Sequence, residues 1–136
     1  MADLFQLRDQ FSQPVFGNNS LALTAVTRFL QPGFGTGIAT TTTVEYRSPD
    51  RVTIWRNLRV HARLAGVGAQ TLTFTLMVGG VATVLSAAGL VTLTDWTDSV
   101  NRVVVPASSL VGIRVTKSAA IGTSPTDIVA SVEIFG

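Results

Sequence analysis

Residues 52–64 read VTIWRNLRVHARL, and their even-numbered positions are apolar with one exception. The even positions hold Val52, Ile54, Arg56, Leu58, Val60, Ala62 and Leu64, with Arg56 as the exception. The odd positions hold Thr53, Trp55, Asn57, Arg59, His61 and Arg63. Because successive side chains of a β-strand point to opposite faces, this pattern predicts a half-buried antiparallel strand with one apolar face and one polar, cationic face.

The same rhythm continues on both sides of this strand. Further strands are expected at residues 39–46, 71–78, 81–85, 90–96, 100–105, 111–116 and 128–135. Gly79-Gly80 is the signal of a two-residue hairpin, whereas residues 21–30 fit no single period. About eight short strands separated by turn signals predict an all-β, antiparallel sandwich.

The composition describes one domain with an unusually uncharged surface. The chain has 136 residues, of which 46% are hydrophobic and 13% are charged, against about 25% charged residues in an average protein. Such a shortage indicates that copies of the chain or other partners cover part of the surface. The alternative is a solvated surface rich in Thr and Ser. The net charge is +2 and the arginines are scattered, so we expect no nucleic-acid partner.

Several classes of protein are excluded or disfavoured by what the sequence lacks. There are no cysteines, so disulfides and cysteine-based zinc sites are impossible. The first residues do not resemble a signal peptide, and no apolar run is long enough for a membrane-spanning helix. We therefore expect a chain that is made and kept soluble without secretion machinery, with no membrane partner.

The N-terminal 37 residues differ from the rest and are expected to form an arm, with the β-sandwich domain at residues 38–136. Leu4, Leu7 and Phe11 have helical spacing before Pro14 stops any helix. The candidate docking residues, which would insert into a neighbouring protein, are Leu4, Phe5, Leu7, Phe11 and Phe16. The alternative is that this segment folds back on its own domain.

Little in the sequence points to catalysis. The one histidine, His61, lies between Arg59 and Arg63 on its strand face, where neighbouring cations disfavour both protonation and metal binding. Asp95 and Asp98 lack the dense acidic pattern of a calcium loop and fit a turn with solvated acids better than a sugar site. We expect no catalytic residues, no metal site and no cofactor.

Contact residues are the better candidates for function. Trp55, Asn57 and Arg59 share the polar face of their strand, and Trp55 and Trp96 are candidates for an exposed contact with a subunit or partner. The alternative is that Trp55 covers a second sheet. Arg56, the exception on the apolar face, is expected to lie near an edge or subunit axis and to pair with Glu45 or Glu133, since an unpaired buried charge is costly.

The segments SPDRVTIWRNLRVHARLAGVGAQTLTFTLMVGGVAT, VNRVVVPASSLVGIRVTKSAA and DIVASVEIF resemble small jelly-roll domains of tailed-bacteriophage virions. These include head decoration proteins, head fibres and tail-fibre knobs with a topology like that of tumour necrosis factor. The resemblance covers about residues 38–136, and Ser108-Ser109 departs from the Gly-Asp often found there. It implies a homotrimer fastened by its leading segment to the major capsid protein or another virion protein, and no catalytic residues.

The sequence therefore predicts a jelly-roll sandwich that acts as a structural virion protein, a capsid decoration or head or tail fibre subunit, assembled in the host cytoplasm. The alternative is a receptor- or glycan-binding knob of a tail fibre, with an aromatic platform at Trp55 or Trp96. A small hydrolase or enzyme accessory module would need a deep pocket with convergent carboxylates. A capsid-lattice or tail-tube subunit would polymerise instead of closing into a ring.

Overall fold

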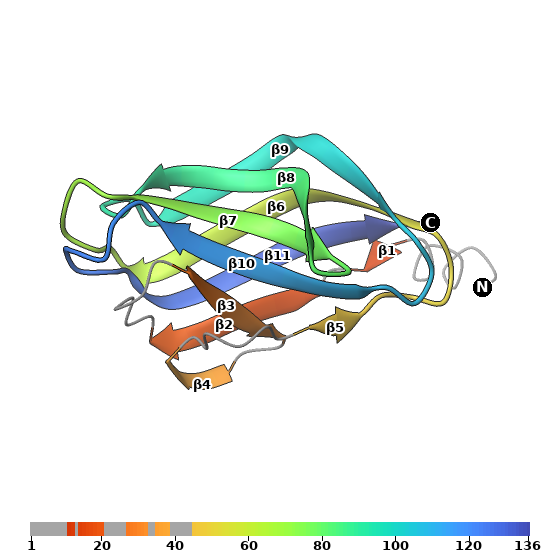
Figure 1. Cartoon of the computed structure of the whole chain (residues 1–136), viewed down its shortest axis with the longest axis horizontal. Helices are drawn as coiled ribbons and strands as arrows, with labels where there is room; N and C mark the ends of the chain where they lie inside the picture. The colour runs from red at the N-terminus through yellow and green to blue at the C-terminus, as the bar shows by residue number, and fades with distance from the viewer. Residues whose placement is uncertain (1–10, 13, 21–26, 33–34, 39–44) are drawn as a thin grey trace, which may run out of the picture.

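The computed structural model describes residues 11–12, 14–20, 27–32, 35–38 and 45–136. Every regular element within these residues is a β-strand, and the strands form a sandwich of two sheets (Figure 1), so the prediction of an all-β sandwich is confirmed. In chain order the strands are β1 (Phe11–Ser12), β2 (Val15–Ser20), β3 (Thr27–Pro32), β4 (Gly35–Ile38), β5 (Tyr46–Arg47), β6 (Thr53–Leu64), β7 (Thr71–Val78), β8 (Val81–Leu90), β9 (Asp95–Val105), β10 (Leu110–Lys117) and β11 (Thr126–Phe135).

Eight strands are hydrogen-bonded to their neighbours in the order β8-β7-β10-β3-β2-β11-β6-β9. We call β2, β11, β6 and β9 the first sheet and β3, β10, β7 and β8 the second sheet. Strand β3 joins them, because its residues 27–30 pair with β10 and its residues 31–32 pair with β2. All these pairings are antiparallel, while the short strand β4 lies parallel to β2.

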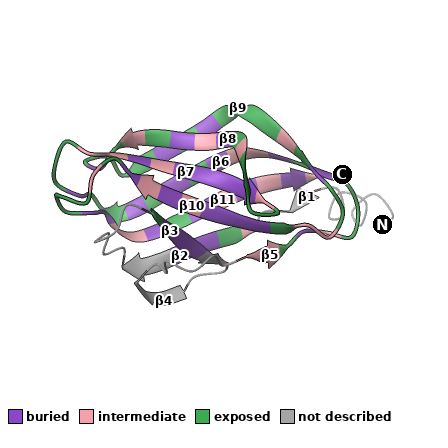
Figure 2. Cartoon of the chain, viewed as in Figure 1, coloured by how far each residue is buried: buried purple, intermediate pink, exposed green. Residues whose placement is uncertain are grey.

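The core lies between the two sheets, where buried and exposed residues alternate along most strands (Figure 2). The predicted strands at residues 71–78 and 128–135 are confirmed, and their apolar side chains alternate into the core, with Leu72, Phe74 and Leu76 on β7 and Ile128, Ala130, Val132 and Ile134 on β11. The Gly79-Gly80 hairpin is confirmed as well. Both glycines have positive φ, 57° and 78°, as the favoured two-residue turn requires.

Strand β6 does not keep one phase along its length. Thr53 and Trp55 face the core before Asn57, whereas Leu58 and Val60 face it afterwards. Asn57 has φ 53°, and the pairing of β6 with both of its neighbours shifts beside it. A β-bulge inserts an extra residue and so exchanges the two faces of the strand beyond it.

Residues 90–105 also differ from the expected pair of strands at 90–96 and 100–105. The chain turns at residues 91–94, where the Leu93 amide donates to the Leu90 carbonyl at 3.2 Å. Strand β9 then runs without interruption through the expected turn at 97–99. It does so because residues 99–101 form a bulge against β6, which changes the inward positions from Trp96 and Asp98 to Val103 and Val105.

The sandwich begins earlier than the expected boundary at residue 38. Strands β2, β3 and β4 belong to the sheets, and Phe16 and Leu30 lie fully buried in the core. Assigning all of residues 1–37 to an arm was therefore wrong, because β2 supplies a hydrogen-bonded neighbour for β11. The expected arm residues Leu4, Phe5 and Leu7 lie outside the described residues.

Candidate functional site

Two of the predicted contact residues lie inside the protein. Trp55 and Trp96 are buried in the core, so the expectation that they form an exposed contact surface or an aromatic platform was wrong. For Trp55 the reason is the bulge at Asn57, which places the residues before it in the opposite phase. The Trp55 indole donates to the Thr53 hydroxyl at 2.8 Å, so its buried N–H has a partner.

The candidate docking residues divide in a similar way. Phe16 packs in the core, edge to face with Tyr46 at 6.3 Å between ring centroids, and cannot insert into a neighbour. Phe11 lies in β1, whose backbone pairs with β11 opposite Phe135. Of the five candidate docking residues, Phe16 is therefore excluded, and the segment before residue 11 stays a prediction.

The outer face of the first sheet gathers the remaining predicted residues. Arg56, Asn57 and Arg59 of β6 all have exposed or half-buried side chains on this side of the sandwich. Cross-strand pairing sets three rows across it, which are Val129–His61–Asp95, Ser131–Arg59–Thr97 and Glu133–Arg56–Arg102. This face is the candidate functional site.

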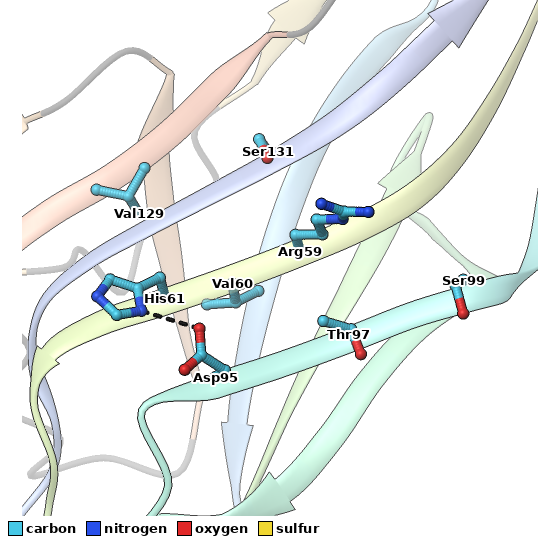
Figure 3. Close-up of a pocket in the computed structure, with 8 residues that line it drawn as sticks. All are labelled: Arg59, Val60, His61, Asp95, Thr97, Ser99, Val129 and Ser131. Carbon is cyan, nitrogen blue, oxygen red and sulfur yellow. Dashed lines mark hydrogen bonds and ion pairs between the residues drawn. The ribbon is translucent and has the colours of Figure 1, made fainter.

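A shallow hollow of about 720 Å³ occupies the first two of these rows (Figure 3). It is lined by Arg59, Val60, His61, Asp95, Thr97, Ser99, Val129 and Ser131. The volume falls within the range of small-molecule sites, about 300–1,000 Å³. The sequence alone does not predict the hollow, because the register set by the two bulges decides which residues of the three strands lie side by side.

His61 and Asp95 form a pair at one end of the hollow, which Figure 3 shows as a dashed line. His61 Nδ1 lies 2.9 Å from Asp95 Oδ1, and 64% and 67% of the two side chains are exposed. The hydrogen bond from His61 is the main cause that lowers the pKa of Asp95, so this carboxylate is ionised at neutral pH. An aspartate partner for His61 was not predicted from the sequence, because only the register between β6 and β9 places Asp95 opposite His61.

Arg59 occupies the middle of the hollow, between the hydroxyl-bearing residues of β9 and Ser131 of β11 (Figure 3). Its guanidinium has no ion pair or hydrogen bond with any residue that the structure describes. The acids of this face are occupied elsewhere, Asp95 by His61, Asp127 by Arg63 and Glu133 by Arg56. Arg59 therefore presents to the hollow a guanidinium that no described residue contacts.

Arg56 belongs to a second cluster on the same face. Its Nε lies 3.6 Å from Glu133 Oε2, which confirms the predicted pairing with Glu133, and its guanidinium stacks 4.1 Å from the Phe135 ring centroid. Asn57 donates to the same Glu133 oxygen at 2.5 Å. Arg56 does not face the core as expected, because the bulge follows it directly. This cluster fixes the bulge and is occupied by its own contacts.

Asp98 was not identified as a structural residue from the sequence. Its carboxylate accepts hydrogen bonds from the backbone amides of Ser86, Val100 and Asn101 and from the Asn101 side chain. Burial alone would raise the pKa of Asp98, but these hydrogen bonds outweigh it and lower the pKa. The signal in the sequence is the Asp-x-x-Asn spacing, since aspartate commonly bonds the backbone two or three residues on.

Neither metal chemistry nor a membrane span is visible in the part of the chain that the structure describes. No three His, Asp or Glu side chains there lie close enough together to hold a metal ion. Likewise, the described residues contain no helix long and apolar enough to cross a membrane. In comparisons with known proteins, no protein-family model and no curated protein matches the chain.

Proposed function

We propose that this chain is a structural virion protein, a capsid decoration or a head or tail fibre subunit, which self-associates as a trimer and fastens to the particle through its N-terminal residues. It acts by adhesion and carries out no reaction. Its partners are copies of itself and the major capsid protein or another virion protein.

The strand order supports assigning the fold as a jelly roll. The first sheet has the order β2-β11-β6-β9, and the second has the order β3-β10-β7-β8. The chain therefore passes from one sheet to the other at β2–β3, β3–β6, β6–β7, β8–β9, β9–β10 and β10–β11, as two interlocked Greek keys require. This is the fold that the resemblance to phage virion domains implies.

Exposed aliphatic side chains carry the proposal of self-association. Val104 of β9 is 64% exposed and is paired with the exposed Ile54 of β6, which is in turn paired with Phe135 of β11. This apolar row crosses the outer face of the first sheet, beside the Arg56 cluster. Burying apolar area stabilises an interface by about 25 cal/mol per Å². In a chain with 13% charged residues, such a row fits a surface covered by sister subunits.

The row predicts where a single charge prevents association. Val104→Glu is expected to convert the trimer to a monomer, because a carboxylate would be buried without a partner. The matched control is Val67→Glu, a change at a 67% exposed valine in the connection between β6 and β7, at the opposite end of the sandwich (Figure 1). Light scattering during size-exclusion chromatography gives both masses. Equal masses for the two variants would contradict this assignment of the interface.

Attachment through the N-terminal residues is tested by deleting only the residues that precede the first described strand. Deleting residues 1–19 would remove most of β2 and the core residue Phe16, so loss of binding would follow from unfolding alone. Deleting residues 2–10 leaves every described strand in place. We expect this variant to keep the fold and mass of the full chain but to fail to co-sediment with particles that lack the protein. Co-sedimentation at the level of the full chain would overturn attachment through this segment.

A further inference from the structure

We propose that the hollow around Arg59 binds an acidic saccharide, with the sugar carboxylate on the Arg59 guanidinium and the ring hydroxyls on the side chains of β9. The inference does not depend on the trimer or on attachment through the N-terminal residues. It replaces the aromatic platform expected at Trp55 and Trp96, which the burial of both rings excludes.

Charge sets the class of ligand. Arg59 is the guanidinium of this hollow, and among the described residues nothing pairs with it. A guanidinium presents a planar set of donors that matches a carboxylate with two parallel hydrogen bonds. Glu133 and Asp127 pair with Arg56 and Arg63, and Asp95 is hydrogen-bonded to His61, so none of these acids contacts Arg59 and its guanidinium is open to an external anion.

The groups around Arg59 favour a sugar over a simple anion. The hydroxyls of Thr97 and Ser99 line one side, and the ionised Asp95 accepts hydrogen bonds at the end of the hollow (Figure 3). A carboxylate accepts hydrogen bonds from ring hydroxyls, whereas a sulfate has no hydrogen to donate to it. Val129 adds an apolar contact for the C–H face of a ring.

The size of the site fits one monosaccharide. Six of the eight lining residues occupy two rows across three strands. Neighbouring strands lie about 4.8 Å apart, and side chains two residues apart on one strand lie about 6.8 Å apart. The polar groups therefore cover about the footprint of one pyranose ring with its substituents. Without an aromatic surface for stacking, we expect weak binding with a Kd of about 1 mM, which repeated sites in an assembly would strengthen.

The test uses the full ¹⁵N-labelled chain and three small probes. These are methyl β-D-glucuronide, methyl β-D-glucoside, which has the same ring without the carboxylate, and acetate, which has the carboxylate without the ring. We expect saturable shifts of the Arg59 side-chain signal and the Thr97 and Ser99 amides with the glucuronide. The Kd for the glucoside and for acetate is expected to be at least about tenfold higher.

Two variants and a control connect binding to the site. Arg59→Gln is expected to weaken glucuronide binding at least about tenfold, because it removes the charged fork, and Thr97→Val about threefold, because it removes one hydroxyl. Arg102→Gln removes an exposed arginine of the same face that lies outside the hollow, and is expected to leave the Kd unchanged. All three substitutions lie at exposed positions and are expected to preserve the fold, which the amide spectrum checks.

Three outcomes would overturn the proposal. These are equal affinity for glucuronide and glucoside, equal affinity for glucuronide and acetate, and glucuronide binding that survives Arg59→Gln. None of them bears on self-association, which Val104→Glu tests at a different row of the sheet.

Discussion

Two buried charged residues, Asp98 and Lys117, show how differently this protein accommodates charge. Asp98 is 7% exposed and its carboxylate is surrounded by four donors, whereas Lys117 is 1% exposed and its ammonium donates, among the described residues, to the Ser124 hydroxyl alone, at 3.2 Å. Burial lowers the pKa of Lys117. The burial of Lys117 is consistent with the sequence pattern, because Lys117 continues the inward-facing series Val111, Ile113 and Val115 of β10.

Replacing Lys117 by methionine is expected to stabilise the fold by about 1–3 kcal/mol at neutral pH, because it removes an incompletely hydrogen-bonded buried ammonium. The pKa of Lys117 in the folded chain lies below its ordinary value of 10.5, so the unfolded chain binds the proton more tightly and the cost is greatest at low pH. The gain of the variant should shrink as the pH rises toward 10.5. Urea unfolding across this range measures it. A variant less stable than the wild type at every pH would contradict the account.

Asp98→Asn is expected to destabilise the protein by about 1–3 kcal/mol at pH 7, because the amide turns two donors toward backbone amides that need acceptors. The native pKa of Asp98 lies below 3.8. Its contribution is therefore present above that pH and is lost as the pH falls through the native pKa. The difference between wild type and variant in urea unfolding should decrease on acidification. A difference that is independent of pH would show that the hydrogen bonds do not depend on the carboxylate charge.

At the scale of the element, the alternation of apolar residues predicts those strands that have no bulge. The inward faces of β7 and β11 follow from their sequences because each keeps one phase. Strands β6 and β9 change phase, so Trp55 and Trp96 were assigned to the surface incorrectly. The signal was present in β6, since Arg56 interrupts the apolar series directly before the bulge at Asn57. An inserted residue explains such an exception better than a buried arginine does.

The candidate site was predictable in part for the same reason. The pairing of Arg56 with Glu133 needed only the right two residue types on one sheet face, and it was predicted. The His61–Asp95 pair and the hollow depend on which residue of β9 lies opposite which residue of β6. Single-sequence patterns do not contain that register, because the bulge at residues 99–101 sets it.

The bulge predicts how substitutions at Asn57 change the stability of the protein. Its φ of 53° is tolerated by asparagine and glycine but strained for a β-branched residue. We expect Asn57→Val to cost about 1–3 kcal/mol more than Asn57→Gly, and both lose the same hydrogen bond to Glu133. Chemical denaturation gives both free energies of unfolding. Equal stability of the two variants would mean that the strand can straighten here without penalty.

The whole molecule combines a core that is filled between two sheets with an exposed apolar surface, which we propose is covered by copies of the chain. Strands β2 and β3 complete the two sheets and join them, so residues assigned to an arm instead build the domain. The apolar row at Val104 and Ile54 remains in solvent when the fold is complete. The hollow at Arg59 lies on the same sheet in separate rows, so self-association and ligand binding are separable by mutation.

Sedimentation equilibrium of the unmodified chain, from low to high micromolar concentration, tests self-association most directly. The account predicts a single species of three times the 14.4 kDa chain mass that persists on dilution. A species of one chain mass at every concentration would contradict it.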